Sequence, residues 1–283
     1  MIFYKYHGIG NDFILIDCIN EPVKFTDFSS KMIIQLCHRH FGIGADGVLF
    51  VMTGKNGNNY RMRLLNSDGS EGQMCGNGIR CVAKHIYDKI ERKQKLAIET
   101  LAGLIIVDMK NALAGQISVN MGKPIFLAEK IPTIAGIDDR NRCRFPDADL
   151  PFEFYIVSTG VPHCVIFVED LTLVNIKDVA PRIEKHSYFP EGTNVNFVQV
   201  IAYNCLKAVV WERGAGFTMA CGTGACASLV CGVLAGLVQK DVEVILPGGT
   251  LNISWEEDET VKMHGDAKLS FHGEFLNSDY QTI

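Results

Sequence analysis

The chain has 283 residues, of which 47% are hydrophobic and 21% are charged, and its formal net charge is -5. This length fits one large domain or two domains of ordinary size. The small negative charge and the lack of a basic run remove the electrostatic field that gathers nucleic acid or anionic lipid, so we expect neither as a partner.

The N-terminal residues 1–7 predict a strand. They lack the basic segment followed by an apolar stretch that marks a secretory signal. Ten cysteines in such a chain indicate a reducing compartment, so we expect a cytoplasmic protein without a disulfide framework. The cysteine spacings differ from those of structural zinc knuckles, and no metal is expected.

Strands around a central helix are predicted for the first part of the chain. A glycine turn feeds a β-rich run over residues 7–17, and apolar spacing predicts a helix over residues 29–40. Another helix is expected just after Cys75. The remaining strand predictions, all short apolar runs bounded by turn residues, are residues 48–51, 61–66, 96–100 and 104–109.

The second part of the chain repeats this order. A glycine turn and a β-rich run cover residues 159–169, and a helix is predicted over residues 178–188 with Pro181 in its first turn. A helix again follows a cysteine, here Cys221. The strand predictions are residues 195–201, 207–212, 242–246 and 250–255. A last strand at 268–275 falls outside the repeat, and we expect it to complete the first half.

The two cysteine segments carry the clearest sign of duplication, because Cys75-Gly76-Asn77-Gly78 recurs as Cys221-Gly222-Thr223-Gly224. The sequence therefore predicts an α+β fold of two pseudo-symmetric domains, each a mostly antiparallel β-sheet or barrel wrapped around a central helix. We expect residues 1–118 and 265–283 in the domain of Cys75 and residues 119–264 in the domain of Cys221, with the active site in the cleft between them. Residues 136–146 are the best candidate for a linker.

Residues 218–239 contain no charged side chain and are long enough to cross a bilayer as a helix. Four glycines and several hydroxyl and thiol side chains lie in this stretch. A helix that is apolar on all sides is also typical of a protein core. We interpret the segment as a buried helix and expect no membrane association.

Each Cys-Gly-x-Gly segment is expected where a strand hands over to a helix. The glycines permit a tight turn and leave N–H groups pointing outward, which makes an anion site at the positive end of the helix dipole. The same field lowers the pKa of a cysteine at that position. With one sulfur on each side of an α-amino acid, we expect a thiolate to remove the α-proton and the opposite thiol to return one, which inverts the α-carbon without a cofactor.

Cysteine is ordinarily a small buried hydrophobe, and we interpret the other eight cysteines as structural, seven of them buried and Cys143 as a thiol in a loop. His163 is either a hydrogen-bonded structural histidine or a partner for a thiol. Glu212 and Arg213 end an apolar run close to the second cysteine, so we expect them to contact substrate rather than only water. Three asparagines in glycine-rich surroundings either form turns or bind the polar groups of an amino acid: Asn11, Asn66 and Asn194.

Seven short segments carry a family resemblance, namely Gly8–Phe13, Asn66–Glu71, Cys75–Gly78, Pro162–Cys164, Gly192–Asn194, Glu212–Gly214 and Ala220–Gly224. Through them the chain resembles diaminopimelate epimerases along essentially its whole length. The resemblance implies the two-domain fold of that family, commonly a homodimer. It also implies an isomerase that needs no cofactor and interconverts LL- and meso-2,6-diaminopimelate for lysine and peptidoglycan synthesis.

Carried over by position, the resemblance implies that Cys75 and Cys221 are the acid and base. Four residues are implied to hold the reacting carboxylate: Gly76, Asn77, Gly222 and Thr223. The implied substrate-binding residues are Asn11, Asn66, Asn194, Glu212 and Arg213, with the distal end of the substrate held mainly by Asn66, Asn194 and Arg213.

The chain departs from the family pattern at three positions. Val161 stands where many members have a substrate-contacting asparagine, Gly47 where some have a glutamine, and Phe217 where a glutamate is frequent. Loss of the amide at position 161 removes a polar contact worth about 0.5–1.5 kcal/mol. We therefore expect relaxed specificity, with slow racemisation of other amino acids such as glutamate.

Two kinds of alternative stand beside this interpretation. Among enzymes, the chain is also similar to proline racemases and other cofactor-independent racemases, and to phenazine-pathway isomerases. From other classes come a noncatalytic amino-acid-binding protein or thiol switch, and a dinucleotide-binding protein suggested by Gly42–Gly47. The last is disfavoured because its glycine fingerprint should follow a strand and open a helix, whereas here a helix pattern precedes and a strand pattern follows.

Overall fold

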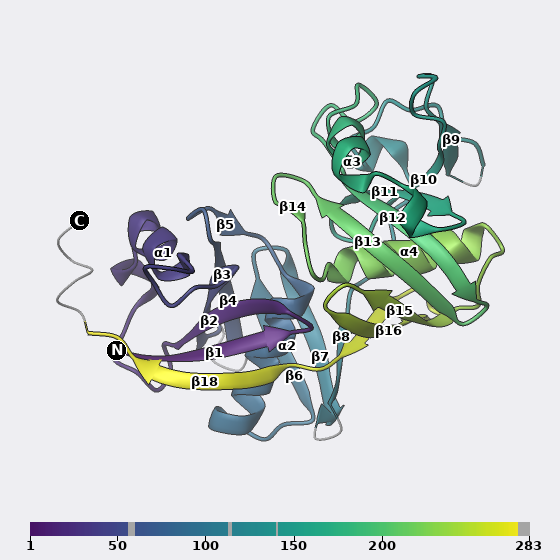
Figure 1. Ribbon diagram of the computed structural model, residues 1–283. Coiled ribbons are helices and arrows are strands. Elements are labelled where there is room, and N and C mark those ends of the chain that lie inside the picture. Colours follow the sequence, from purple (N-terminus) through teal and green to yellow (C-terminus); the bar gives the residue numbers. More distant parts are fainter. Residues whose placement is uncertain (56–59, 113–114, 140, 277–283) are drawn as a thin grey trace. The chain divides into compact units, whose positions relative to one another are not determined.

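The computed structural model describes residues 1–55, 60–112, 115–139 and 141–276 (Figure 1). Residues 277–283 of the expected first domain and residue 140 of the expected linker lie outside the described residues. The chain divides into two compact units, one made of Met1–Val119 with Gly265–Ile283 and the other of Asn120–His264. The first unit holds Cys75 and the second holds Cys221.

The sheet of the first unit is mostly antiparallel, with parallel pairs between antiparallel ones. β2 pairs antiparallel with β1 and parallel with β3, β3 pairs antiparallel with β4, and β4 pairs parallel with β6. β7 is antiparallel to both β6 and β8. The strands are β1 (Ile2–Gly8), β2 (Asn11–Asp17), β3 (Gly47–Thr53), β4 (Tyr60–Asn66), β5 (Glu71–Gly72), β6 (Lys95–Thr100), β7 (Gly103–Asn111) and β8 (Gln116–Asn120).

The last strand of the chain belongs to this sheet. β18 (Lys268–Glu274) pairs antiparallel with β1, and Figure 1 shows it in yellow along that strand. The backbone N–H of Phe275 also donates to the carbonyl oxygen of Met1 at 3.1 Å. The predicted return of residues 268–275 to the first half is therefore confirmed.

Helix α2 (Gly76–His85) forms the centre of the first unit and packs against strands on several sides. Its side chains Ile79, Cys81 and Val82 are fully buried. Burying an apolar side chain of this size stabilises the fold by about 1.5–3 kcal/mol. A separate apolar cluster lies under α1 (Ser30–Cys37), where Ile33 and Leu36 pack with Phe50 of β3.

The second unit repeats the ladder of the first. β11 pairs antiparallel with β10 and parallel with β12, β12 pairs antiparallel with β13, and β13 pairs parallel with β15. β16 is antiparallel to both β15 and β17. The strands are β9 (Arg142–Arg144), β10 (Glu153–Ser158), β11 (Pro162–Val168), β12 (Asn194–Ala202), β13 (Cys205–Glu212), β14 (Gly216–Phe217), β15 (Asp241–Leu246), β16 (Gly249–Trp255) and β17 (Val261–Gly265).

Helix α4 (Gly222–Leu234) is the counterpart of α2 in the second unit. Most of its side chains are buried, and it packs against β10, β11, β13 and β16. The charge-free stretch at 218–239 is thus a core helix with flanking loops. Across the described residues, no helix combines the length and the apolar character needed to span a bilayer.

The α+β fold is confirmed, and each predicted strand overlaps an observed one. The helix bounds were less accurate. The expected helix at 29–40 ends at Cys37, and that at 178–188 is α3 (Ile176–Glu184), in which Pro181 lies beyond the first turn. Single-turn helices cover Phe25–Asp27, Ile86–Ile90, Ala128–Lys130 and Leu171–Leu173.

The expectation of a linker at residues 136–146 is wrong. This segment lies within the second unit, and β9 within it pairs antiparallel with β10. Phe145 is buried and stacks on Phe154 with ring centroids 4.2 Å apart. The polar composition of the segment reflects an edge strand of the sheet rather than a connection between units.

Candidate active site

Cys75 caps the N-terminus of α2. It has extended backbone angles, and its Sγ accepts a hydrogen bond from the backbone N–H of Gly78 at 3.4 Å. The sulfur therefore takes the place that a serine or aspartate oxygen usually occupies at a helix start. It is half-buried and lies at the positive end of the helix dipole, which favours an anion.

Asn77, the second residue of α2, links this cysteine to Asn11 at the start of β2. Its Nδ2 donates to Asn11 Oδ1 at 3.2 Å, and that same oxygen lies 3.7 Å from Cys75 Sγ, within hydrogen-bonding reach of a thiol. The side chain of Arg80 is fully buried beneath the loop and donates to Asn77 Oδ1 at 2.9 Å. Three residues expected at the site, Asn11, Cys75 and Asn77, are thus joined directly.

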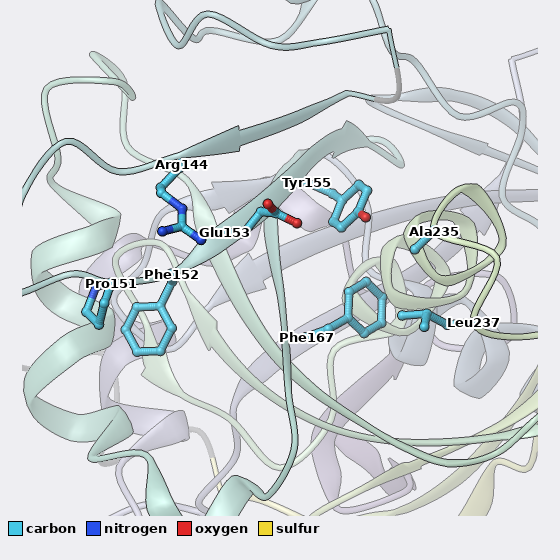
Figure 2. Close-up of a pocket in the computed structure, with 8 residues that line it drawn as sticks. All are labelled: Arg144, Pro151, Phe152, Glu153, Tyr155, Phe167, Ala235 and Leu237. Carbon is cyan, nitrogen blue, oxygen red and sulfur yellow. The ribbon is translucent and has the colours of Figure 1, made fainter.

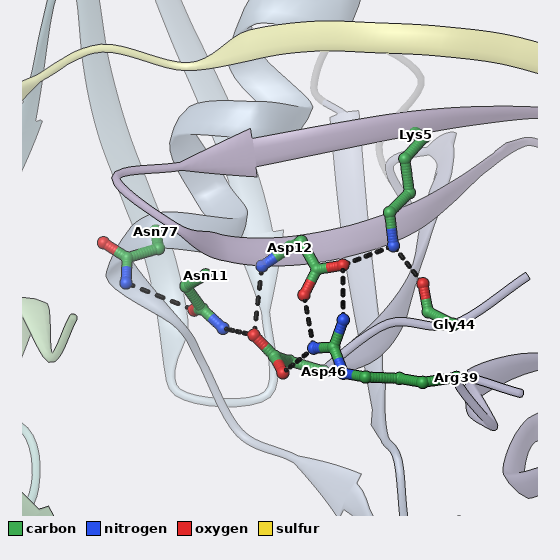
Figure 3. Close-up of polar contacts among 7 residues, drawn as sticks. All are labelled: Lys5, Asn11, Asp12, Arg39, Gly44, Asp46 and Asn77. Carbon is green, nitrogen blue, oxygen red and sulfur yellow. Dashed lines mark hydrogen bonds and ion pairs between the residues drawn. The ribbon is translucent and has the colours of Figure 1, made fainter. Parts of the chain in front are cut away.

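A charged network lies on the other side of Asn11 (Figure 3). Asn11 Nδ2 donates to Asp46 Oδ2 at 2.6 Å, and Arg39 bridges Asp46 and Asp12 at 2.7 Å each. Lys5 donates to Asp12 at 2.5 Å and also to the carbonyl oxygen of Gly44. Burial alone would raise the pKa of Asp12, but hydrogen bonds from Arg39 and Lys5 outweigh it and lower that pKa.

Cys221 caps α4 in the same manner as Cys75 caps α2. Its Sγ accepts from the backbone N–H of Gly224 at 3.3 Å and lies 3.4 Å from the hydroxyl of Thr223. The side chain is 4% exposed. The hydroxyl of Thr159 donates to the carbonyl oxygen of Thr223 at 2.8 Å. This hydrogen bond connects the glycine turn before β11 to the start of α4.

His163 lies beneath this second loop. Its Nδ1 is 2.9 Å from Asn196 Oδ1, and Asn196 Nδ2 donates to the carbonyl oxygen of Gly224 and to the hydroxyl of Ser228. Because the amide nitrogen of Asn196 is committed to two acceptors, its oxygen must accept, and Nδ1 of His163 carries the proton. Complete burial lowers the pKa of His163 to about 4, and the hydrogen bond to Asn196 opposes this only in part. The imidazole is neutral near pH 7.

Asn194 at the start of β12 and Arg213 just after β13 are joined by a hydrogen bond. Asn194 Oδ1 accepts from the backbone N–H of Arg213 at 2.8 Å, and its Nδ2 donates to the carbonyl oxygen of Pro162 at 3.1 Å. The guanidinium of Arg213 is held by the carbonyl oxygen of Glu191 at 2.8 Å. Glu212 accepts from the hydroxyl of Thr218 at 2.6 Å, so its carboxylate is oriented toward the chain that leads into Cys221.

The other expected positions are more loosely connected. Asn66 ends β4, where its Nδ2 donates to the hydroxyl of Ser70 at 3.0 Å and so helps to close a turn. Val161 is half-buried just before β11, Gly47 begins β3, and Phe217 is 49% exposed in β14. Of the eight cysteines interpreted as structural, Cys18, Cys143 and Cys205 are only half-buried, and the others are buried.

Several residues of these networks were not predicted from the sequence, among them Asp46, Arg39, Arg80 and Asn196. Asp46 lies inside the glycine segment 42–47, whose glycine spacing suggested only a dinucleotide fingerprint. Arg80 lies three residues after Asn77, the spacing at which helix side chains meet, and that spacing was the available signal.

A hollow of about 410 Å³ opens elsewhere in the second unit, between β9, β10, β11 and the loop after α4 (Figure 2). Arg144, Glu153 and Tyr155 line it together with aromatic and aliphatic side chains. None of these lining residues belongs to either cysteine loop. Within the described ranges, no group of three or more histidine, cysteine, aspartate or glutamate side chains is arranged to hold a metal ion.

Solved structures share the fold at low sequence identity. A putative phenazine biosynthesis PhzC/PhzF protein from Clostridium difficile (strain 630) matches with a TM-score of 0.69 and 14% identity, over 98% of this chain and 99% of that one. A probable proline racemase from Agrobacterium radiobacter K84 matches with a TM-score of 0.68 and 13% identity, over 99% and 94%. The chain therefore has the duplicated α+β fold that racemases and phenazine biosynthesis proteins share.

Sequence comparison narrows this class. The diaminopimelate epimerase family matches residues 3–127 and 155–270. Diaminopimelate epimerase 1 of Nostoc sp. (strain PCC 7120) is 47% identical over 277 residues, which cover 96% of this chain and 98% of that one. The enzyme of Desulfitobacterium hafniense (strain DSM 10664 / DCB-2) is 45% identical over 281 residues, 98% of each chain. The chain belongs to the diaminopimelate epimerase family.

Family membership confirms the predicted class, an isomerase of the amino-acid epimerase type. The alternatives from other classes are not favoured. The segment Gly42–Gly47 follows α1 and leads into β3, the reverse of the order that a dinucleotide fingerprint needs.

Proposed function

We propose that Cys75 and Cys221 are the acid and base that interconvert the LL and meso forms of 2,6-diaminopimelate. The supporting observation is the duplicated cap: in each unit a cysteine sulfur receives the N–H of the third residue of a central helix. The N-terminus of a helix stabilises the thiolate form of a cysteine at this position. A neutral, structural cysteine has no need of such a position. Because both units carry the arrangement, two proton-transferring groups are available for one substrate.

The proposed reaction moves one proton off the α-carbon and another onto its opposite face. The thiolate of one cysteine forms an S–H bond with the α-proton, and the C–H electron pair passes into the adjacent carboxylate. The thiol of the other cysteine then gives its proton to the α-carbon and becomes the thiolate. Each positioned acid or base contributes on the order of 10²- to 10⁴-fold in rate.

The substrate carboxylate at the reacting centre is proposed to bind at the two helix N-termini. Backbone N–H groups of Gly76 and Gly222 and the side chains of Asn77 and Thr223 are available there, and donors fixed in advance stabilise charge as it develops. His163 is hydrogen-bonded to Asn196, which in turn donates to the carbonyl oxygen of Gly224 in the second loop. We propose that His163 supports the position of Cys221 through this pair of hydrogen bonds.

The distal amino-acid end of the substrate is proposed to bind Asn66, Asn194 and Arg213, with Asn11 and Glu212 contacting the rest of the molecule. Arg213 offers a guanidinium, which pairs with a carboxylate through two parallel hydrogen bonds. Its Nη1 and backbone N–H are already fixed by Glu191 and Asn194, so the side chain is restrained before substrate arrives.

The decisive test is solvent deuterium incorporation at the α-carbon of LL-diaminopimelate by the full chain. Cys75→Ser and Cys221→Ser are expected to lose nearly all epimerisation while circular dichroism and urea unfolding remain unchanged. Cys205→Ser, a half-buried cysteine far along β13 from the second loop, is the matched control and should retain wild-type turnover. Undiminished turnover in either loop variant would contradict the proposed roles.

Relaxed specificity is a further part of the proposal, supported by Val161 in place of a polar side chain. We expect slow racemisation of L-glutamate beside fast epimerisation of LL-diaminopimelate. Val161→Asn should raise the ratio of the two rates in favour of diaminopimelate by roughly 2- to 10-fold, the equivalent of one hydrogen bond. Undetectable exchange at the α-carbon of glutamate would end this idea.

The resemblance to the family also supports a homodimer and a cytoplasmic location, and we propose both. Light scattering on the eluting chromatographic peak measures the mass in solution. A mass near that of a single 31.3 kDa chain at assay concentration would contradict the dimer. Fractionation of cells that produce the protein tests the location.

A further inference from the structure

The hollow in the second unit lies on one face of the sheet that β9, β10 and β11 form (Figure 2). Glu153 of β10 stands opposite Arg144 of β9 in the antiparallel register, and Tyr155 stands opposite Arg142. Phe154, which lies between the two in β10, belongs to the apolar core on the other face. Because successive side chains of a strand point to opposite faces, the charged and phenolic side chains of this region gather on the side of the hollow.

Helix α4 packs against β10 and β11 and ends at the hollow. The backbone N–H of Leu237 donates to the carbonyl oxygen of Gly232 at 2.9 Å, and that of Gly236 donates to Val233 at 3.0 Å, which closes the helix in a Schellman turn. Ala235 and Leu237, both in this turn, line the hollow. The partial negative charge at the C-terminus of the helix favours a cation nearby.

One part of the hollow is apolar. The rings of Phe167 and Tyr155 meet edge to face, with centroids 5.7 Å apart and an interplanar angle of 79°. Phe152 and Leu237 add to this lining, and Leu237 is 38% exposed. Small-molecule sites are typically lined by such side chains, and aromatic groups favour the edge-to-face contact that this pair already makes.

Another part of the hollow carries two opposite charges that do not neutralise each other. Arg144 and Glu153 are cross-strand neighbours, yet Glu153 pairs with Arg142 instead, from its Oε1 at 3.3 Å. Arg142 also pairs with Asp138 at 3.0 Å. Within the described residues, the guanidinium of Arg144 has no carboxylate partner and Oε2 of Glu153 has no donor. A donor of positive charge and an acceptor of negative charge therefore stand side by side and open to the hollow.

The hydroxyl of Tyr155 is a third polar group without a partner. Tyr155 is only 9% exposed, and across the part of the chain that the structure describes its hydroxyl forms no hydrogen bond. Burial and then the carboxylate of Glu153 raise the pKa of Tyr155, so the phenol keeps its proton near pH 7. Buried polar groups of native proteins nearly always have a partner, from the protein or from a bound molecule. This hydroxyl is available to a molecule that enters the hollow.

We propose that the hollow is a second binding site, for a free α-amino acid with an aromatic side chain. The carboxylate of the ligand pairs with Arg144 through two parallel hydrogen bonds, and its ammonium group pairs with Oε2 of Glu153. The aromatic ring packs on Phe167 and Leu237. The volume of about 410 Å³ is within the range of small-molecule sites, about 300–1,000 Å³.

The two charges select a zwitterion. A simple carboxylate at Arg144 would lie beside the negative charge of Glu153, and a simple amine at Glu153 would lie beside the positive charge of Arg144. An α-amino acid carries both groups on one carbon and satisfies both side chains at once. The inference does not rest on the proposed roles of the two cysteines.

The test is a ligand-observed NMR titration of the full chain with L-tryptophan, whose apolar ring also has one N–H for the hydroxyl of Tyr155. A dissociation constant on the order of 1 mM is expected for a ligand of this size at ordinary efficiency. Two analogues each lack one charge, since indole-3-propionate has no ammonium group and tryptamine has no carboxylate. Each should bind at least about 10-fold more weakly than L-tryptophan, because a charge-assisted pair is lost and the repulsive neighbour remains. Equal affinity for the three indole compounds, or no binding of L-tryptophan, would overturn the inference.

Two amino acids test the role of the ring. L-Alanine has both charges but no ring, so it should bind at least about 10-fold more weakly than L-tryptophan. L-Lysine ends in a cation, which the C-terminus of α4 would favour. Tighter binding of L-lysine than of L-tryptophan would contradict the aromatic class of ligand.

Charge-removing variants assign each group of the ligand to its side chain. Arg144→Gln should weaken the binding of L-tryptophan and indole-3-propionate by about 10-fold and leave that of tryptamine undiminished. Glu153→Gln should weaken L-tryptophan and tryptamine to a similar extent and leave indole-3-propionate undiminished. Both side chains are exposed, so these variants are expected to fold, which circular dichroism checks. Arg92→Gln, at an exposed arginine of the first unit, is the matched control and should keep every wild-type affinity.

A variant of the proposed substrate site shows where the probe binds. Arg213→Gln should leave the affinity for L-tryptophan unchanged, and loss of binding in this variant would place the probe at that site and overturn the inference. Equal losses for all three indole compounds in Arg144→Gln would contradict the assignment of the carboxylate. These measurements follow binding and not turnover, so their failure is distinct from failure of the cysteine-to-serine test of catalysis.

Discussion

The two helix starts offer a matched pair of glycine-to-alanine changes. In the first unit, a Cβ at Gly78 would lie 3.0 Å from Leu49 Cδ2 and 3.4 Å from Cys75 Cβ. In the second unit, a Cβ at Gly224 would lie 2.9 Å from Val210 Cγ2 and 3.2 Å from both Asn196 Nδ2 and Cys221 Sγ. The same substitution therefore meets one flexible methyl group in the first loop and three restrained atoms in the second.

These contacts set the expected magnitudes. Alanine is favoured over glycine in a helix by about 1 kcal/mol, and this gain applies to both positions. Overpacking a core costs about 1–3 kcal/mol, and at Gly224 it involves a branched valine that is stiff at χ1. We expect Gly78→Ala to leave the free energy of unfolding nearly unchanged and Gly224→Ala to lower it by up to about 2 kcal/mol, the overpacking cost less the helix gain.

Activity should follow the same order. A displacement of about 1 Å at a catalytic group costs on the order of 100-fold in rate, so a shift of a few tenths of an ångström at Cys221 should lower kcat by roughly 3- to 10-fold. Urea unfolding and deuterium exchange on LL-diaminopimelate measure the two effects. Equal losses of stability and activity in both variants would refute the inference that the contacts of the added Cβ set the size of the effect.

Two further predictions concern His163 and Ile9. Because the pKa of His163 falls from its ordinary value of 6.5 to about 4 on folding, only the unfolded chain gains this proton as pH drops through that window. The unfolding free energy should therefore fall by up to about 3 kcal/mol between those pH values, and His163→Gln should remove this part of the pH dependence in urea titrations. Ile9 has a φ of 47°, which a β-branched residue rarely adopts, so Ile9→Gly should raise the midpoint of urea unfolding by the equivalent of about 1 kcal/mol. A lower midpoint for that variant would show that packing of Ile9 outweighs its backbone strain.

Most of the fold could be predicted from the sequence, because the signals that locate strands and helix starts are local in the chain. Alternating apolar runs located the strands, and the repeated Cys-Gly-x-Gly segment located the starts of both central helices. Helix ends were harder to predict. The chain after Cys37 leaves the helix because Gly42 and Gly44 bond back to the carbonyl oxygens of His38 and Leu36, a turn that apolar spacing does not reveal.

The polar networks around the cysteines were not visible in the sequence for a different reason. Asp12 meets Arg39 and Asp46 through contacts between segments that are 27 and 34 residues apart along the chain. Each taken alone is a typical surface charge. The failed linker prediction has a similar origin, since β9 is recognisable as a strand only through its pairing with β10.

Because β18 completes the first sheet, the first unit can be finished only after the second unit has been synthesised. Residues 120–264 form a contiguous unit, and the ribosome completes them before the strand that pairs with β1 has been made. During that interval one edge of β1 offers unpaired N–H and C=O groups, the kind of edge that recruits strands from other chains. The nascent chain thus passes through a stage in which the second unit is complete and the first unit still has an unpaired strand edge. A chain truncated before residue 268 should therefore associate with other chains through β1.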